Sequence, residues 1–209
     1  MESKYIIFGA TGVIGTELQK LLAEANTTAV VRRPKTSIEG IREIVHKDLL
    51  NIQSLSEELV DANVLIALGT TKAKTPDNEK YYQIDHDMPV HIATQAKASG
   101  ARSVHVVSAM GANLESKIFY NATKGKMERD VAEAFPSAYF YRPSLIMGNR
   151  EESRLGESIA KGLFSVINVL LPKKYKGIYP GQIARTMIDN CRQAPKKKLW
   201  KNDDMLNKV

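Results

Sequence analysis

Tyr5 to Gly15 reads YIIFGATGVIG, a short apolar run followed by glycines at positions 9, 12 and 15. A β-branched and aromatic run before such glycines predicts a strand, a tight turn and a helix N-terminus, the arrangement that binds the pyrophosphate of a dinucleotide. The first glycine permits the turn, the second lets the backbone approach the pyrophosphate, and the third lets the helix pack on its strand. We therefore expect a dinucleotide cofactor to lie over Gly9, Thr11, Gly12, Val13, Ile14 and Gly15.

Apolar runs and helical segments alternate along the rest of the chain, which predicts a parallel sheet built from βαβ units. Most of the apolar runs are unbroken, as in strands that are covered on both faces. The predicted strands are residues 5–8, 27–31, 41–45, 64–68, 103–107, 139–141 and a late piece near Ile178. The predicted helices are residues 13–25, 52–59, 78–99, 118–135, 156–170 and 181–191. Only a short connection fits between Pro34 and Gly40, so the helix that commonly joins the second and third strands is expected to be missing or reduced.

This pattern predicts a Rossmann-like α/β fold with a doubly wound parallel sheet of about six or seven strands. We expect one domain over residues 1–209, in which residues 145–180 contribute the substrate side. A chain of 209 residues with 43% hydrophobic residues is large enough to bury its core without disulfides.

The single cysteine, Cys191, fits a reducing compartment, and the chain contains no apolar run long enough to cross a membrane. Because the first strand begins within a few residues of Met1, we expect no signal peptide. These features predict a cytoplasmic protein without a membrane association.

The formal net charge of +7 raises the question of a nucleic-acid partner. The 30 basic residues are scattered among 23 acidic ones, and no predicted helix carries a one-sided basic stripe. A nucleic-acid partner is therefore not favoured, and a protein that binds a polyphosphate cofactor has its own reason to be basic.

The residues after the second predicted strand indicate which dinucleotide is bound. An NAD site usually has a carboxylate there, whereas this chain has Arg32 and Arg33, whose guanidiniums suit a 2′-phosphate. NADP(H) is the expected cofactor, although either arginine could instead point to solvent. Further residues predicted to line the cofactor site are Asp48 and Leu49, beside the adenine, and Leu68 and Gly69, in the crevice where strand order reverses.

Ser108, Tyr120 and Lys124 are the candidate catalytic residues. Ser108 ends the fifth predicted strand, and the other two lie one turn apart on the next predicted helix. A carbonyl that accepts hydride also needs a proton, and a phenol can supply it if its pKa falls from about 10 toward about 7. A dry site containing charged Lys124 and an oxidised nicotinamide would favour that fall. Pro143, after the sixth strand, could line the nicotinamide pocket; the alternative is that the serine only caps a turn and the tyrosine only packs.

GATGVIG, VVRRP, the serine and the Tyr-x-x-x-Lys of YNATKG together resemble an atypical short-chain dehydrogenase/reductase over essentially the whole chain. More narrowly, LGTTKAKTP (68–76), VVSAMGA (106–112) and YRPSLIMGNREESRLGE (141–157) are similar to the Tat-interacting-protein family. The resemblance implies a Rossmann-like fold, NADP(H) bound at Gly9, Thr11, Gly12, Ile14 and Arg32, and a Ser-Tyr-Lys set. It implies no known substrate, because the animal relatives are described chiefly as regulators of transcription and nuclear transport.

Three functions remain open from the sequence. The first is an NADP(H)-dependent oxidoreductase that acts on a small carbonyl or alcohol of unknown identity, as a monomer or homodimer. The second is an NADP(H)-sensing module that docks on another protein with little or no turnover. The third is a flavin or bilin reductase. No metal site is expected, since His86 and His91 are five apart on a predicted helix and would not share a metal-binding face.

Overall fold

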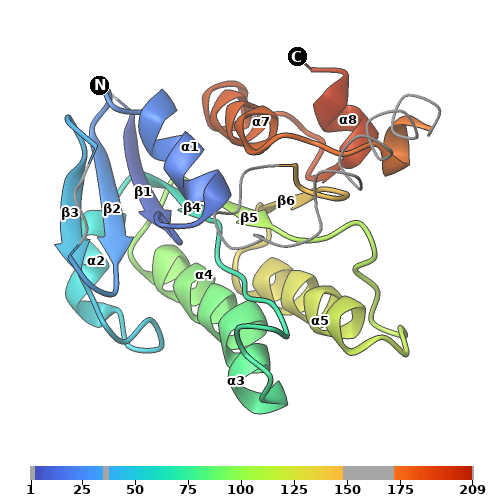
Figure 1. The fold of residues 1–209 in the computed structure, drawn as a ribbon. Coiled ribbons are helices and arrows are strands. Elements are labelled where there is room, and N and C mark those ends of the chain that lie inside the picture. The colour runs from blue at the N-terminus through green and yellow to red at the C-terminus, as the bar shows by residue number, and fades with distance from the viewer. Residues whose placement is uncertain (1–2, 35–37, 148–171, 209) are drawn as a thin grey trace.

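The computed structural model describes residues 3–34, 38–147 and 172–208, and its centre is a seven-stranded parallel sheet (Figure 1). The strand order is β3-β2-β1-β4-β5-β6-β7, so the order reverses between β1 and β4. The strands are β1 (Lys4–Phe8), β2 (Thr27–Val31), β3 (Arg42–Val45), β4 (Ala62–Ile66), β5 (Ser103–Val107), β6 (Tyr139–Arg142) and β7 (Leu199–Lys201). This is the predicted Rossmann-like doubly wound fold.

Helices cover both faces of the sheet and bury one hydrophobic cluster on each (Figure 1). The helices on one face are α1 (Val13–Leu21), α7 (Pro180–Gln193) and the short α8 (Asn202–Leu206). Those on the other face are α2 (Ser56–Leu59), α4 (Met88–Ala98) and α5 (Phe119–Ala134). Successive strand residues point to opposite faces, so Ile6 packs in one cluster and Ile7 in the other.

A single long helix was predicted over residues 78–99, and the structure divides it into three parts. α3 (Asn78–Tyr82) begins at Asp77, whose side chain accepts a hydrogen bond from the backbone N–H of Lys80 at 2.8 Å. A π-helical turn, η2 (Gln83–Asp87), follows and leads into α4, which ends at Ala98, two residues before Gly100 with φ +73°. The end of the predicted helix is correct, whereas the π turn has no sequence signature.

The seventh strand was predicted in the wrong place. Ile178 forms only an isolated bridge with Ile146, and the strand that pairs with β6 is β7, residues 199–201. An Ile flanked by Gly177 and a helix-starting Tyr-Pro pair cannot extend into a ladder. The short strand β7 and the helix that follows it were missed because a three-residue strand carries little apolar pattern.

The remaining elements differ from the prediction by a few residues. α1 ends at Leu21 rather than near residue 25, and β4 lies two residues earlier than expected. Short 3₁₀ turns, η1 (Gln53–Leu55) and η3 (Lys173–Tyr175), precede α2 and follow the undescribed segment. The described residues 38–41 between β2 and β3 contain no helix, as predicted. The predicted helix 156–170 and most of the expected substrate region 145–180 lie outside the described residues.

Candidate active site

The glycine turn after β1 has the geometry that a dinucleotide requires. Gly9 has φ +82°, and a Cβ there would lie 2.5 Å from the carbonyl oxygen of Ala67. A Cβ on Gly15 would lie 2.2 Å from the carbonyl oxygen of Gly9, so the first turn of α1 packs directly on the loop. Glycine is therefore required at both positions by the protein itself.

Gly12 differs from these two glycines, because the protein around it leaves room for a side chain. A Cβ on Gly12 would lie 3.4 Å from its nearest neighbour, the carbonyl oxygen of Gly9. Gly12 is the N-cap of α1, no side chain caps that helix end, and Thr11, Gly12 and Val13 are exposed. Backbone N–H groups at an open, uncapped helix end bind anions, so these residues fit the pyrophosphate of a dinucleotide. Ile14 has a buried side chain and can contribute only its backbone.

The residues predicted for the adenosine end follow β2, β3 and β4. Arg32 and Arg33 are both exposed directly after β2. Asp48 is exposed after β3, and its Oδ1 accepts a hydrogen bond from the backbone N–H of Leu50 at 3.0 Å. Leu49 is buried in the core cluster under the sheet. Leu68 is half-buried and Gly69 exposed beyond β4, at the reversal of strand order.

Ser108, the first residue after β5, presents a buried hydroxyl. The residue is 4% exposed, and its backbone N–H donates to the carbonyl oxygen of Tyr141 at 2.7 Å. In the described part of the chain its Oγ has no hydrogen-bond partner. A buried hydroxyl of this kind costs free energy unless a ligand satisfies it, so the observation points to a ligand oxygen at this place.

Tyr120 and Lys124 lie one turn apart at the start of α5. Tyr120 is 39% exposed, whereas Lys124 is 3% exposed. The close approach of α5 to the preceding loop fixes this region, because a Cβ on Gly125 would lie 2.5 Å from the backbone of Asn113. Pro143 also belongs to this end of the sheet: its carbonyl oxygen accepts from the backbone N–H of Met110 at 3.0 Å and ties the loop after β5 to the end of β6.

Lys124 is paired with Asp85, a residue that sequence reasoning missed. The Lys124 Nζ lies 2.9 Å from Asp85 Oδ1, and the two side chains are 4% and 1% exposed. Asp85 Oδ2 also accepts a hydrogen bond from the backbone N–H of Thr70 at 2.9 Å. Asp85 belongs to the π-helical turn η2, and a carboxylate inside a predicted helix carries no sign of burial in the sequence.

The electrostatic surroundings of Tyr120 combine opposing effects on its pKa. Desolvation raises the pKa of the Tyr120 phenol, nearby Lys124 lowers it, and the Asp85 carboxylate raises it, so that in this chain alone the pKa lies above its ordinary value. The expected fall in the Tyr120 pKa includes the charge of an oxidised nicotinamide, so it stays a prediction for the complex with the cofactor. Lys124 acts in the expected direction, but burial and Asp85 oppose it.

An aromatic ring packs against Tyr120. The Tyr81 ring packs edge-on against Tyr120 and Phe119, with centroid separations of 6.4 and 5.7 Å. Lys72 Nζ lies 4.8 Å from the Phe119 centroid and 5.1 Å from that of Tyr81, and it donates to the carbonyl oxygen of Pro76 at 3.2 Å. Lys72 therefore packs in the loop after β4 rather than extending as a free anion-binding group.

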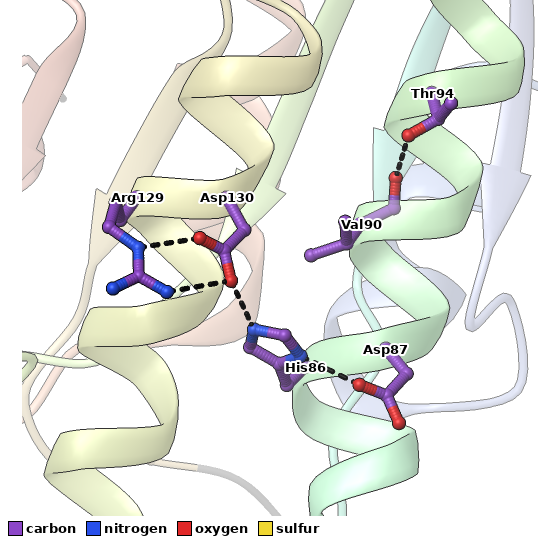
Figure 2. A network of polar contacts seen from close by, with 6 residues as sticks. All are labelled: His86, Asp87, Val90, Thr94, Arg129 and Asp130. Atoms are coloured by element: carbon purple, nitrogen blue, oxygen red, sulfur yellow. Dashed lines mark hydrogen bonds and ion pairs between the residues drawn. The ribbon is translucent and has the colours of Figure 1, made fainter.

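A polar network around His86, the residue after Asp85, connects η2 to α5. Figure 2 shows the His86 ring between two carboxylates, with Nε2 2.8 Å from Asp130 and Nδ1 2.8 Å from Asp87. Arg129 donates to Asp130 as well, at 2.6 and 3.1 Å. The network joins η2, which carries Asp85, to α5, which carries Lys124. It is not a metal centre, and none of the described residues form a cluster of three or more potential metal ligands.

Comparisons with known proteins agree with this geometry. A sequence profile described as NAD(P)H-binding matches residues 9–139. The protein named FMP52, mitochondrial, from Eremothecium gossypii is 35% identical over 196 residues, covering 86% of this chain and 85% of its own. The protein of the same name from Saccharomyces cerevisiae is 32% identical over 157 residues, covering 71% and 68%.

Solved structures show the same fold at low sequence identity. MoeE5 in complex with UDP-glucuronic acid and NAD superposes with a TM-score of 0.69 at 16% identity, covering 95% of this chain and 75% of that one. A GalE-like L-threonine dehydrogenase from Cupriavidus necator, in its holo form, has a TM-score of 0.68 at 17% identity, covering 96% and 76%.

The relatives also correct one expectation. The FMP52 proteins of several fungi are named mitochondrial, which contradicts the predicted cytoplasmic location. A lone thiol indicates a reducing compartment without saying which one. As for membranes, none of the helices in the described ranges has the length and apolar character of a transmembrane span.

The glycine cradle, the profile match and the FMP52 relatives agree with the resemblance seen in the sequence. The chain belongs to the NAD(P)H-binding family and is related to the FMP52 proteins, in agreement with its resemblance to atypical short-chain dehydrogenases/reductases.

Proposed function

We propose that this protein is an NADP(H)-dependent oxidoreductase that interconverts a small carbonyl compound and its alcohol. The observation that carries the proposal is the buried Ser108 hydroxyl, whose Oγ has no hydrogen-bond partner in the described residues. Ser108 follows β5, the neighbour of β4, at the carboxyl edge of the sheet, where doubly wound folds bind their ligands. A substrate carbonyl oxygen would accept a hydrogen bond from the Ser108 hydroxyl, which removes the free-energy cost of a buried, unpaired donor.

The chain supplies the proton for this reaction. When bound, the cofactor supplies a hydride to the carbonyl carbon. Ser108 donates a hydrogen bond to the carbonyl oxygen, and as the π electrons move onto that oxygen Tyr120 transfers its phenolic proton to it. The charge on Lys124 stabilises the phenolate that remains, and the 39% exposure of Tyr120 lets solvent return the proton.

The proposed preference for NADP(H) over NAD(H) rests on Arg32. This arginine is exposed directly after β2, where an NAD site usually presents a carboxylate. The planar guanidinium can bind a 2′-phosphate with two parallel hydrogen bonds. Arg33 has the same exposure and could assist or remain in solvent.

A kinetic comparison of two tyrosine variants tests the proposed reaction. NADPH consumption with a panel of small aldehydes and ketones should fall about 100-fold to 10,000-fold in Tyr120→Phe, because the general acid is lost. NADPH affinity should stay nearly unchanged. Tyr139→Phe, which removes a hydroxyl at the start of β6, at the opposite edge of the sheet from Ser108, is the matched control and should retain full activity. Unaltered turnover in Tyr120→Phe would refute the assigned role.

One observation favours the alternative of an NADP(H)-sensing module. Several large apolar side chains are exposed around the first turn of α5 and after β5 and β6, namely Met110, Ile118, Phe119 and Leu145. Large apolar side chains exposed in these segments offer contacts for another protein. NADPH binding without consumption of NADPH on any carbonyl would support the sensing module. Flavin reduction that survives in Tyr120→Phe would instead identify a flavin reductase, the third function considered.

A further inference from the structure

Asp85 connects three separate elements of the candidate active site. Its backbone belongs to the π turn η2, its Oδ2 accepts from the N–H of Thr70 after β4, and its Oδ1 lies 2.9 Å from the Lys124 ammonium of α5. The fit around it is close, since a Cβ on Gly69 would lie 3.4 Å from Asp85 Oδ1. Single π turns inside helices often occur at functional sites, where they redirect a side chain.

The pair places two opposite charges next to one reacting phenol. Lys124 is one helical turn from Tyr120, so its full charge would stabilise the phenolate strongly if it stood alone. The carboxylate of Asp85 offsets that charge within the same buried space, where both side chains are at most 4% exposed. Water cannot screen the balance between them as it would at the surface.

Other charged or titratable groups near Tyr120 do not replace this balance. Tyr81 packs against the phenol edge-on, and Lys72 lies over the rings of Tyr81 and Phe119. His86, next to Asp85 in sequence, is held by Asp87 and Asp130. Among the described residues, the pair formed by Lys124 and Asp85 is thus the buried ion pair beside the phenol.

We propose that Asp85 is a positioning residue that fixes the Lys124 ammonium and, by offsetting its charge, sets the pH at which Tyr120 exchanges its proton. This inference rests on the proposed function of Tyr120 as the proton donor. It means that the chain keeps its phenol protonated, as a proton donor must be. The opposing effects of Lys124 and Asp85 on the pKa of Tyr120 agree with it.

Asp85→Asn is the sharpest variant, because it removes the charge and keeps the shape. The Asn Oδ1 can still accept from the N–H of Thr70, while the ammonium loses its counter-charge. Tyrosine labelled with ¹³C at Cζ reports phenol ionisation by NMR, and the Tyr120 signal is assigned by its loss in Tyr120→Phe. At a fixed pH of about 10, the ratio of phenolate to phenol at Tyr120 should rise about tenfold or more in Asp85→Asn.

Asp87→Asn provides the matched control, because Asp87 lies on the same turn with a carboxylate 42% exposed that faces His86 instead. The ratio should be unchanged in this variant. No change in Asp85→Asn, or an equal change in Asp87→Asn, would overturn the inference.

Asp85→Asn/Lys124→Met removes both buried charges and protects the test against misfolding of the single variant. The Tyr120 pKa of the double variant should lie close to that of the unmodified chain, because the two charges offset each other. A pKa raised by about 1 unit or more would mean that Asp85 does not offset Lys124 and would contradict the inference.

These measurements need neither cofactor nor substrate. Absence of turnover alongside the expected change in Tyr120 ionisation would therefore refute the proposed function and leave the electrostatic role of Asp85 established.

Discussion

The ammonium of Lys124 lies 2.9 Å from the carboxylate of Asp85, and both side chains are almost fully buried. The pair joins α5 to the helical segment before α4, and the same carboxylate also holds the loop after β4 through Thr70. This ion pair therefore contributes both to packing and to the candidate active site. Single and double variants of the two residues are needed to separate its effect on stability from its effect on Tyr120.

The buried pair predicts strongly non-additive stability changes. Removing one partner, in Asp85→Asn or Lys124→Met, leaves the other poorly compensated and should lower the free energy of unfolding by about 3–5 kcal/mol. Removing both should cost much less than the sum of the single changes. Urea unfolding of the four proteins measures the coupling, and additive losses would show that the two groups do not interact.

The glycine turn predicts that two similar substitutions will have opposite consequences. Gly15→Ala places a methyl group 2.2 Å from the carbonyl oxygen of Gly9 and should lower the melting temperature clearly. Gly12→Ala meets its nearest atom at 3.4 Å and should fold nearly as well as the parent, but its methyl group occupies the space of the pyrophosphate. Thermal unfolding and NADPH titration together measure the two effects.

Gly100→Ala is the control for the glycine variants, because φ is +73° there and no atom lies within 4 Å of the added Cβ. It should cost about 1 kcal/mol through backbone strain alone and leave NADPH affinity intact. Wild-type affinity in Gly12→Ala would contradict the assignment of this turn as the phosphate site.

Arg32→Asp should reverse the cofactor preference. The substitution removes a guanidinium from the 2′-phosphate and places a carboxylate where an NAD site carries one. NADPH affinity should fall about 10-fold to 100-fold, and NADH affinity should hold or improve. Fluorescence titration with both nucleotides measures the ratio, with Arg33→Asp in parallel. An unchanged ratio in Arg32→Asp would show that this residue does not read the phosphate.

His105 predicts a pH dependence of stability. Burial, with nearby Lys198 adding to it, lowers the pKa of His105 to about 3, and the ring bonds to Tyr141 and Ser103 at 2.8 and 3.0 Å. The unfolded chain binds this proton at a pKa of about 6.5, so the stability present above that value is lost progressively as pH falls toward about 3.

The contribution of His105 to the pH dependence is at most about 1.4 kcal/mol per pH unit in that range. In His105→Gln the unfolding free energy should vary less with pH between about 6 and 4, whereas His46→Gln, at a less buried site, should retain the full dependence. Equal slopes in both variants would contradict the buried, neutral state of His105.

The sequence predicted those features that are encoded locally. The Gly9 to Gly15 turn, the first six strands, and the end of the long helix just before Gly100 depend on backbone conformation and apolar runs. These are written in neighbouring residues, and the structure confirms them.

The features that the sequence did not predict depend on contacts between distant segments. The Asp85 carboxylate meets an ammonium 39 positions further along the chain, and the π turn that places it has no composition signature. The direction of the Tyr120 pKa shift in the chain alone was unpredictable for the same reason, because it depends on burial and on a counter-charge from another helix. Strand β7 was missed since three edge residues carry too little apolar pattern.

A crystal structure of the protein with NADP⁺ tests most directly the claim that cofactor and catalytic residues converge. We expect the pyrophosphate over the Gly12 backbone, the 2′-phosphate on Arg32, and nicotinamide C4 facing the Ser108 and Tyr120 hydroxyls. A nicotinamide that lies away from both hydroxyls would contradict the proposed reaction, even if the pyrophosphate is bound as expected.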